Sequence, residues 1–310
     1  MRVLFWGTPD FATPSLRALI GEGFDVVGAV TQPDRAVGRS RSILQAPPVK
    51  EIAGSEGIPV FQPERPRDET FISHLEALTP DISVVVAYGH ILSQRIIELP
   101  PRGTINIHAS LLPRLRGAAP IQAAIRDGHD ETGVTIMRMV QKLDAGPVIH
   151  RVRTPIPDDE TYGELQLRLA EMGAMALIEA LALIDVGAAT EEPQDEAAAT
   201  YAPKIERDMA RVHWGADARE VARIIRAYDP RPGAFASSSS GEVKLFGARL
   251  AARNGSAKPG CVLDVAEDGM VVACGVGAVR ITNVQAAGKR RMSPAEWARG
   301  RGVSPGDLLS

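Results

Sequence analysis

The sequence predicts an α/β protein in two parts, a parallel sheet covered by helices and then a smaller β-barrel. First, the chain has 310 residues, which is more than one ordinary domain usually holds. Second, its N-terminal part alternates short apolar runs with segments of helical spacing, the pattern of a parallel sheet with crossover helices. Third, the part after residue 206 reads mainly as short strands between Gly-rich turns, which is typical of a small barrel.

The first part opens as a βαβ unit. Residues 2–7 are an apolar run ending in Gly, residues 11–20 carry apolar side chains at helical spacing, and residues 26–31 are apolar again. Further strands are predicted at 59–61, 82–87, 104–108 and 133–139, with helices at 49–56, 70–78, 91–98, 121–127 and 161–184. Gly7-Thr8-Pro9 is not the Gly-x-Gly-x-x-Gly of a dinucleotide site. The prediction is therefore a Rossmann-like sheet without a nicotinamide site.

A loop is predicted at residues 32–48, longer than most connections. It carries Arg35, Arg39 and Arg41 and no aromatic residue. Arginines without aromatic partners suit phosphate contacts better than base stacking. A solvated surface loop is the alternative interpretation.

The stretch 104–120 combines a strand with a rigid loop. Side chains of a strand alternate between its faces, so Asn106 and His108 point the same way. Pro113 and Gly117 keep the following residues from forming a helix. An amide donor and an imidazole at a strand end can hold a reacting carbonyl. Taken alone, two such residues would more often only satisfy a local turn, because short polar patterns are common.

The whole stretch is more specific than its parts. Asn106-Ile107-His108, Ser110-Leu111-Leu112-Pro113 and Arg116-Gly117-Ala118-Ala119-Pro120 resemble the signature of the folate-dependent formyltransferases, most closely those that act on methionyl-tRNA. Asp144, in Leu143-Asp144-Ala145-Gly146-Pro147, matches the third catalytic position of that family. Leu115 and Ala109 depart from the pattern, since the family often has an aromatic residue and a glycine there.

The segments after residue 189 differ in composition. Residues 1–189 form the predicted catalytic domain, the acidic and Ala-rich residues 190–206 a linker, and residues 207–310 a tRNA-binding barrel domain. The barrel strands are predicted at 243–246, 249–252, 260–265, 270–273 and 278–284, after a helix at 217–227. Residues 207–310 carry 16 Lys/Arg against 10 Asp/Glu, and Lys289, Arg290 and Arg291 form a basic turn. This charge suits a polyanion partner or an ordinary solvated surface.

Composition excludes several classes of protein. No apolar run approaches the roughly 20 residues that cross a bilayer, and the N-terminus lacks a signal peptide's pattern. Cys261 and Cys274 form no metal-binding cluster, and two cysteines fit a reducing compartment. We therefore expect a cytoplasmic protein, without a metal or a membrane partner, and a monomer.

The resemblance implies a reaction and its residues. A formyl group would pass from N10 of 10-formyltetrahydrofolate to the α-amine of methionine on initiator tRNA. His108 and Asn106 would stabilise the oxyanion, and Asp144 would orient His108 and help to move protons. Folate would lie along Ser110, Leu111, Leu112 and Pro113. The tRNA would contact Arg35, Arg39 and Arg41 and the basic turn at Lys289, Arg290 and Arg291. The barrel would be of the oligonucleotide-binding type.

Two rival functions share these features. A 10-formyltetrahydrofolate hydrolase, or a formyltransferase acting on a small amine, would use the same trio, and activity without a response to tRNA would favour it. An RNA-binding module that only senses folate would bind tRNA without turnover.

Overall fold

The computed structural model describes residues 1–37, 43–252 and 257–310, and these divide into two compact units. The first unit comprises residues 1–117, 133–154 and 166–201, and the second comprises residues 118–132, 155–165 and 202–310. Arg39 and Arg41 of the predicted tRNA loop lie outside the described residues. Each unit is described by itself below.

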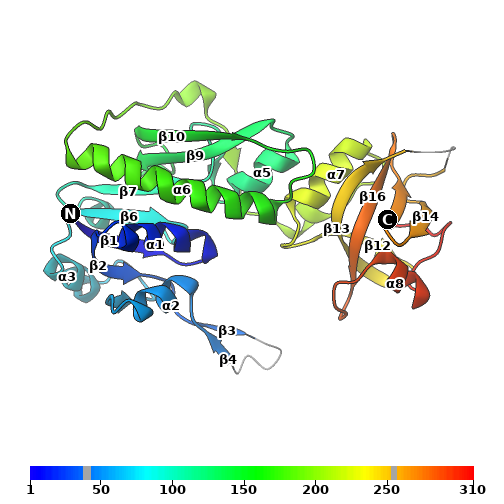
Figure 1. Cartoon of the computed structure of the whole chain (residues 1–310), viewed down its shortest axis with the longest axis horizontal. Helices are drawn as coiled ribbons and strands as arrows, with labels where there is room; N and C mark the ends of the chain where they lie inside the picture. Colours follow the sequence, from blue (N-terminus) through cyan, green and yellow to red (C-terminus); the bar gives the residue numbers. More distant parts are fainter. Residues whose placement is uncertain (38–42, 253–256) are drawn as a thin grey trace. The chain divides into compact units, whose positions relative to one another are not determined.

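A seven-stranded sheet forms the centre of the first unit (Figure 1). Its strands, in spatial order, are β10 (Val148–Pro155), β9 (Glu131–Arg138), β7 (Thr104–His108), β6 (Ile82–Val86), β1 (Arg2–Gly7), β2 (Asp25–Val30) and β5 (Val60–Phe61). The run from β7 to β5 is parallel, and β9 pairs with β7 in the antiparallel direction. The predicted Rossmann-like, mostly parallel sheet is confirmed.

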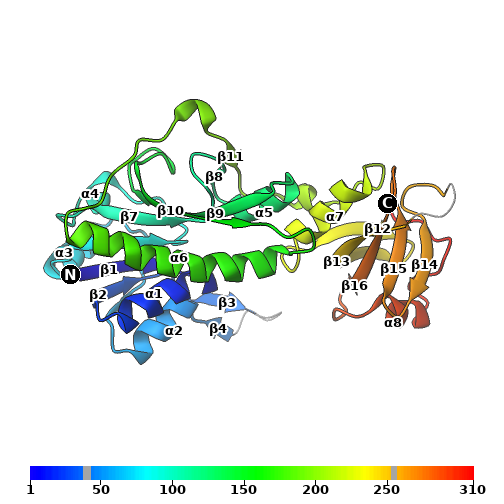
Figure 2. The same ribbon diagram turned by 45° about the horizontal axis from the view of Figure 1, so that its top comes forward.

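The central strands of the sheet are buried on both faces, and they are nearly continuous apolar runs. Every residue of β6 is buried, as the sequence predicts for a strand covered from both sides. The helices of this part are α1 (Thr13–Gly21), α2 (Pro48–Ser55), α3 (Glu69–Ala77), α4 (Gln94–Ile97) and α6 (Tyr162–Asp185). The helix α6 packs on β7 and β9, where Gly173 lies against Ile107 and Val134. Figure 2 shows α6 on one side of β7, β9 and β10 and the short strands β8 (Arg116–Gly117) and β11 (Tyr201–Ala202) on the other.

The residues predicted as one long loop, 32–48, contain a short hairpin. The strands β3 (Arg35–Val37) and β4 (Ile43–Gln45) pair in the antiparallel direction. Each strand has only three residues, too few to show an alternating apolar pattern in the sequence.

The second unit is built on a five-stranded antiparallel sheet. In spatial order its strands are β12 (Ala234–Ser238), β13 (Gly241–Ala251), β16 (Ala278–Ala286), β15 (Gly269–Ala273) and β14 (Val262–Ala266). The helices of the unit include α5 (Pro120–Arg126), α7 (Ala218–Ala227) and α8 (Pro294–Arg299). Val221 and Ile225 of α7 and Trp297 of α8 join the sheet side chains in one buried core.

The structure adds elements that periodicity did not indicate. The strands β10 and β12 and the helix α8 were not predicted, and the predicted strands 243–246 and 249–252 are one strand, β13. β10 has partly exposed and polar residues over most of its length, so its apolar signal is weak. α8 has six residues and begins with a capping box between Ser293 and Glu296, a signal that the prediction overlooked.

Candidate active site

Asn106 and His108 lie on the same face of β7, as the alternation predicts. Asn106 pairs with Met137 of β9 and His108 with Thr135. Ile107 points to the opposite face, against α6. The His108 side chain is buried, whereas Asn106 is only partly buried.

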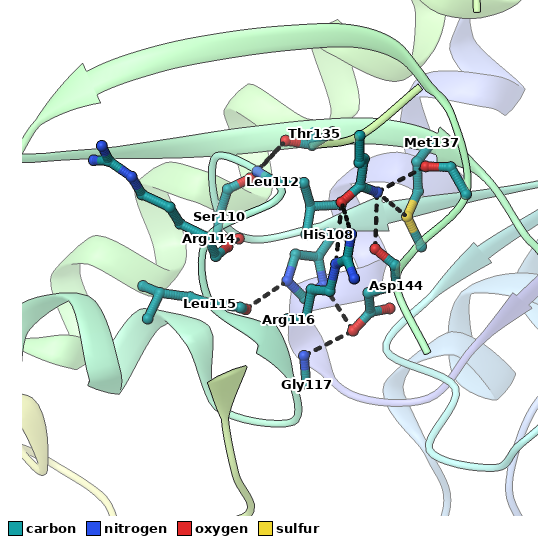
Figure 3. A network of polar contacts seen from close by, with 12 residues as sticks. His108, Ser110, Leu112, Arg114, Leu115, Arg116, Gly117, Thr135, Met137 and Asp144 are labelled. Carbon is teal, nitrogen blue, oxygen red and sulfur yellow. Dashed lines mark hydrogen bonds and ion pairs between the residues drawn. The ribbon is translucent and has the colours of Figure 1, made fainter. Parts of the chain in front are cut away.

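One ring nitrogen of His108 is fixed by the backbone. Its Nε2 lies 2.9 Å from the carbonyl oxygen of Leu115. A carbonyl oxygen can only accept, so Nε2 carries a proton and donates it. The other nitrogen, Nδ1, therefore faces Asp144, with 3.7 Å between Nδ1 and the carboxylate oxygen Oδ2 (Figure 3).

Asp144 is held by backbone groups of two loops. Its Oδ2 accepts a hydrogen bond of 2.8 Å from the backbone N–H of Gly117. Its own φ is +48°, in the left-handed region that non-glycine residues rarely adopt. Two residues on, a Cβ on Gly146 would lie 1.8 Å from the carbonyl oxygen of Arg138, so only glycine fits. The loop therefore has little freedom in how it presents the carboxylate.

A buried arginine lies beside this loop. The Arg116 side chain is fully buried and donates to Gln194 Oε1 and to both carboxylate oxygens of Glu196. Lys142 also contacts Glu196, at 2.5 Å. The hydrogen bonds from Arg116, and then those from Lys142, lower the pKa of Glu196 to about 2. Glu196 is thus an anion at any ordinary pH.

The Asn106 amide is the polar group that remains available. It makes no hydrogen bond with the residues that the structure describes. An amide N–H next to an imidazole and a carboxylate can donate to an oxygen that gains negative charge. β7 thus carries an amide and an imidazole on one face, and the imidazole faces the Asp144 carboxylate.

The predicted folate stretch divides into inward and outward side chains. The Ser110 hydroxyl is buried and donates to the Arg114 carbonyl oxygen at 2.6 Å. Leu112 is buried with Met137 and Val148. Leu111 and Pro113 remain partly exposed. Only those two side chains are available to a ligand without rearrangement.

The predicted tRNA residues are found in both units. In the first, Arg35 Nη2 donates to Gln32 Oε1 at 2.7 Å. In the second, Arg290 Nη2 lies 2.9 Å from Glu296 Oε1, and Lys289 is exposed. Arg291 differs, because it pairs with buried Asp229 at 3.1 Å and its guanidinium carbon lies 4.1 Å from the centre of the Phe246 ring. Arg291 is therefore anchored to the unit by these two contacts, although the residue itself is exposed.

Sequence reasoning missed Gln194 and Thr200. The Gln194 amide donates to two backbone carbonyls of the Asp144 loop, and Thr200 Oγ1 accepts from the Leu115 N–H at 2.8 Å. Their partners are 50 and 85 positions away in the chain. No local spacing signals such contacts, and both residues lie in the acidic segment predicted as a linker.

Two kinds of feature are absent from the described residues. No helix of residues 1–37, 43–252 or 257–310 is long and apolar enough to cross a membrane. The same residues contain no group of three His, Cys, Asp or Glu side chains placed to hold a metal ion.

Known proteins resemble the chain over its whole length. The formyl transferase family matches residues 1–181, and the C-terminal domain of formyl transferases matches residues 204–302. A methionyl-tRNA formyltransferase of Moorella thermoacetica is 45% identical over 309 residues, covering 100% of this chain and 99% of that protein. One of Magnetococcus marinus is 47% identical, covering 99% of this chain and 98% of the relative.

Solved structures show the same fold at lower identity. A variant of HypX from Aquifex aeolicus matches 98% of this chain and 48% of its own, with a TM-score of 0.70 and 22% identity. WlaRD, a sugar 3N-formyl transferase, matches 94% of this chain and 99% of its own, with a TM-score of 0.68 and 17% identity. These likenesses concern the fold, and the full-length relatives define the family. The chain belongs to the formyltransferase family and, within it, to the methionyl-tRNA formyltransferases.

Proposed function

We propose that this protein transfers the formyl group of 10-formyltetrahydrofolate to the α-amine of initiator methionyl-tRNA, for translation initiation. The observation that carries the proposal is the full-length similarity to curated methionyl-tRNA formyltransferases, at 45% and 47% identity. Support comes from Asn106 and His108, which share one face of β7, and from His108 Nδ1, which lies 3.7 Å from Asp144 Oδ2.

The site residues divide the chemistry between them. The neutral amine attacks the formyl carbon, and the electron pair of the carbonyl moves onto its oxygen. The Asn106 amide donates to that oxyanion, and His108 is a second donor when Nδ1 carries a proton. Nε2 is excluded from this role, because its proton is held by Leu115. When the intermediate collapses, the bond from carbon to N10 breaks, its electron pair stays on N10, and N10 takes up the proton that the amine lost, passed on by Asp144 or by water.

Asp144 has two functions in this scheme. Its carboxylate faces His108 Nδ1 and helps to orient the ring, and it accepts the proton that the amine loses, directly or through water. The products are the N-formylated methionyl group and tetrahydrofolate. A carboxylate and an imidazole are sufficient for these proton transfers.

The binding surfaces are assigned by residue. We place the folate co-substrate along Ser110, Leu111, Leu112 and Pro113, where Leu111 and Pro113 offer partly exposed apolar surface. We assign tRNA phosphates to Arg35, Arg39, Arg41, Lys289 and Arg290, with Arg291 supporting the last two. Such contacts add salt-sensitive affinity and little sequence choice.

The domain organisation and the cellular setting complete the proposal. Residues 1–189 would be the catalytic domain, 190–206 the connection and 207–310 the tRNA-binding domain. The family matches at 1–181 and 204–302 support this division. We propose a cytoplasmic monomer.

The decisive experiment compares two charged tRNAs. Purified protein is given 10-formyltetrahydrofolate with initiator or elongator methionyl-tRNA, and loss of the free α-amine is measured. Formylation of the initiator, and much slower reaction of the elongator, is the expected result. Folate turnover with neither tRNA formylated would identify a hydrolase or a small-amine transferase. Binding of tRNA without any turnover would identify the RNA-binding module.

A further inference from the structure

The segment 194–200 contacts the supports of both ionisable residues of the candidate site. At one end, Gln194 binds the loop that carries Asp144. At the other, Thr200 binds Leu115, whose carbonyl oxygen accepts from His108. Its acidic and Ala-rich composition had marked this part of the chain as a linker.

Gln194 uses every hydrogen-bonding position of its side chain. Its Nε2 donates to the carbonyl oxygens of Asp144, at 2.8 Å, and Gly146, at 2.7 Å. Its Oε1 accepts from Arg116 Nε, at 3.1 Å, and Nη2, at 2.8 Å. Carbonyls can only accept and a guanidinium can only donate, so the orientation of the amide is fixed. The contacts of Gln194 define a single arrangement of the loop.

The Asp144 loop needs this external support. Asp144 adopts a left-handed φ of +48°, a conformation that persists only where the surroundings enforce it. The two carbonyls that flank Ala145 receive their donors from Gln194. Without those donors, polar groups of the loop would have to find other partners, and the carboxylate would move with them.

Thr200 holds the loop opposite His108 by three hydrogen bonds. Its Oγ1 accepts from the Leu115 N–H at 2.8 Å, and its carbonyl oxygen accepts from the Arg116 N–H at 2.9 Å. Its own N–H donates to the Pro113 carbonyl oxygen at 3.3 Å. Leu115 has a φ of +58°, so this residue too is held in an unfavourable conformation. Its carbonyl oxygen is the group that fixes the ring of His108.

Arg116 links the two ends. Its side chain binds Gln194 and Glu196, and its backbone N–H binds Thr200. Since the Arg116 side chain is fully buried, removal of its partners would leave an uncompensated charge. The segment and the loop after β7 therefore adopt their conformations together.

We propose that Gln194 and Thr200 are positioning residues for formyl transfer, with Gln194 acting through Asp144 and Thr200 acting through His108. This inference rests on the proposed function, because its main readout is the rate of that reaction. It assigns a role in the site to a part of the chain outside the signature motif.

Gln194→Glu is the informative variant for the proposed action of Gln194 through Asp144. The carboxylate still accepts from Arg116, but it places acceptors opposite two carbonyls. We expect kcat for methionyl-tRNA formylation to fall by roughly 10- to 100-fold, as for a misplaced catalytic group. The KM for 10-formyltetrahydrofolate should change by less than about 3-fold. Gln166→Glu, on partly exposed α6, is the matched control and should leave kcat unchanged.

A double-variant cycle separates positioning from general damage. If Gln194 acts through the Asp144 carboxylate, its effect should nearly vanish once that carboxylate is gone. In an Asp144→Asn protein, adding Gln194→Glu should therefore lower kcat by less than about 3-fold. An equal fall in kcat in the unaltered protein and in the Asp144→Asn protein would overturn the inference, because Gln194 would then act independently of Asp144. Gln194→Ala provides the same comparison if the Glu variant does not fold.

Thr200→Val tests the proposed action of Thr200 through His108, by a signal from His108 itself. The variant removes the hydroxyl acceptor of the Leu115 N–H and keeps the shape of the side chain. We expect the imidazole nitrogen signals of His108 to shift in NMR spectra, with a changed pH–rate profile. Thr200→Ser should restore both, and exposed Thr190→Val should leave both unaltered. Unchanged His108 signals in a folded Thr200→Val protein would refute this proposed action.

Failure of this inference is distinct from failure of the proposed function. If the unaltered protein does not formylate methionyl-tRNA, the function is wrong. If it does, and the Gln194 and Thr200 variants keep its kcat, the function stands and the positioning role is wrong.

Discussion

His108 Nδ1 and Asp144 Oδ2 face each other across 3.7 Å, beyond the 2.7–3.2 Å range of a direct N–H to O hydrogen bond. The carboxylate takes its close contact from the Gly117 N–H instead. His108 is held on its other side, by the Leu115 carbonyl oxygen. Two backbone groups of one loop thus hold the two side chains, and Nδ1 can act on a substrate oxygen or a water.

Asp144→Asn should abolish most of the turnover and little of the binding. An amide oxygen can still accept from the Gly117 N–H, so the loop is retained, but the negative charge beside Nδ1 is lost. We expect kcat to fall by about 10²- to 10⁴-fold, the usual contribution of a proton-transfer group. Folate binding, measured by calorimetry, should stay within a few-fold. Asp130→Asn, on an exposed carboxylate, is the control, and a near-normal kcat in Asp144→Asn would remove Asp144 from the mechanism.

Asn106→Ala should show how far kcat falls when an oxyanion donor is missing. The amide makes no hydrogen bond within the described part of the chain, so its removal leaves no partner unsatisfied and stability should change little. We expect kcat to fall by about 10²- to 10³-fold. Single-turnover rates with saturating substrates measure this. A variant with lower stability and normal kcat would mean that Asn106 serves only the strand.

How much of the fold could be predicted depended on the regularity of each element. The buried strand β6 and the long helix α6 have strong periodic patterns, and the structure has both close to the predicted bounds. The hairpin of β3 and β4 has too few residues for a pattern, and the predicted helix at 91–98 is one turn, α4. Two predicted strands are joined as β13 through Gly247, whose φ is +64°.

The arrangement of the site could be predicted only for residues that are close together in the sequence. Asn106 and His108 share a strand, and their common face follows from its alternation. Asp144 required the resemblance, because no spacing relates it to His108. Gln194 and Thr200 could not be found, since their contacts depend on how a polar segment returns to the loops after β7. The roles of the site residues stay predictions until the variants are measured.

Gly146→Ala should destabilise the Asp144 loop, whereas Gly54→Ala should stabilise the protein. A Cβ at position 146 would lie 1.8 Å from the Arg138 carbonyl oxygen, which forces the backbone to shift at a cost of about 1–3 kcal/mol. A Cβ at Gly54, within α2, meets no atom within 4 Å, and alanine is the better helix former by roughly 0.5–1 kcal/mol. Urea unfolding measures both. Equal effects at the two positions would contradict the close packing at Gly146.

Within the basic turn, Lys289→Ala and Arg291→Ala should differ. Lys289 makes no ion pair with the described residues, so its loss should leave stability within about 0.5 kcal/mol. If Lys289 contacts a phosphate, the slope of log affinity for tRNA against log salt should decrease by about 1. Arg291→Ala removes a partner of buried Asp229 and a contact with Phe246, and should cost about 1–3 kcal/mol. Salt-dependent tRNA binding and thermal unfolding distinguish the two variants. An Arg291→Ala protein of unchanged stability with weakened tRNA binding would show that Arg291 contacts the tRNA and does not support the unit.

The stabilisation that the ion pairs of Glu196 provide should be lost only at low pH. Hydrogen bonds from Arg116 and Lys142 lower the pKa of Glu196 from its usual 4.5 to about 2 in the folded protein. Because the pKa is lower in the folded protein, the stabilisation is complete at pH values above the pKa of the unfolded chain. It is lost as the pH falls through the pKa of the folded protein. The difference in melting temperature between the unaltered protein and Glu196→Gln should therefore be constant from pH 5 to 8. It should shrink below about pH 4.5 as the carboxylate is neutralised in the unfolded chain. A difference that first declines near neutral pH would assign the titration to another group and contradict the ion-pair arrangement around Arg116.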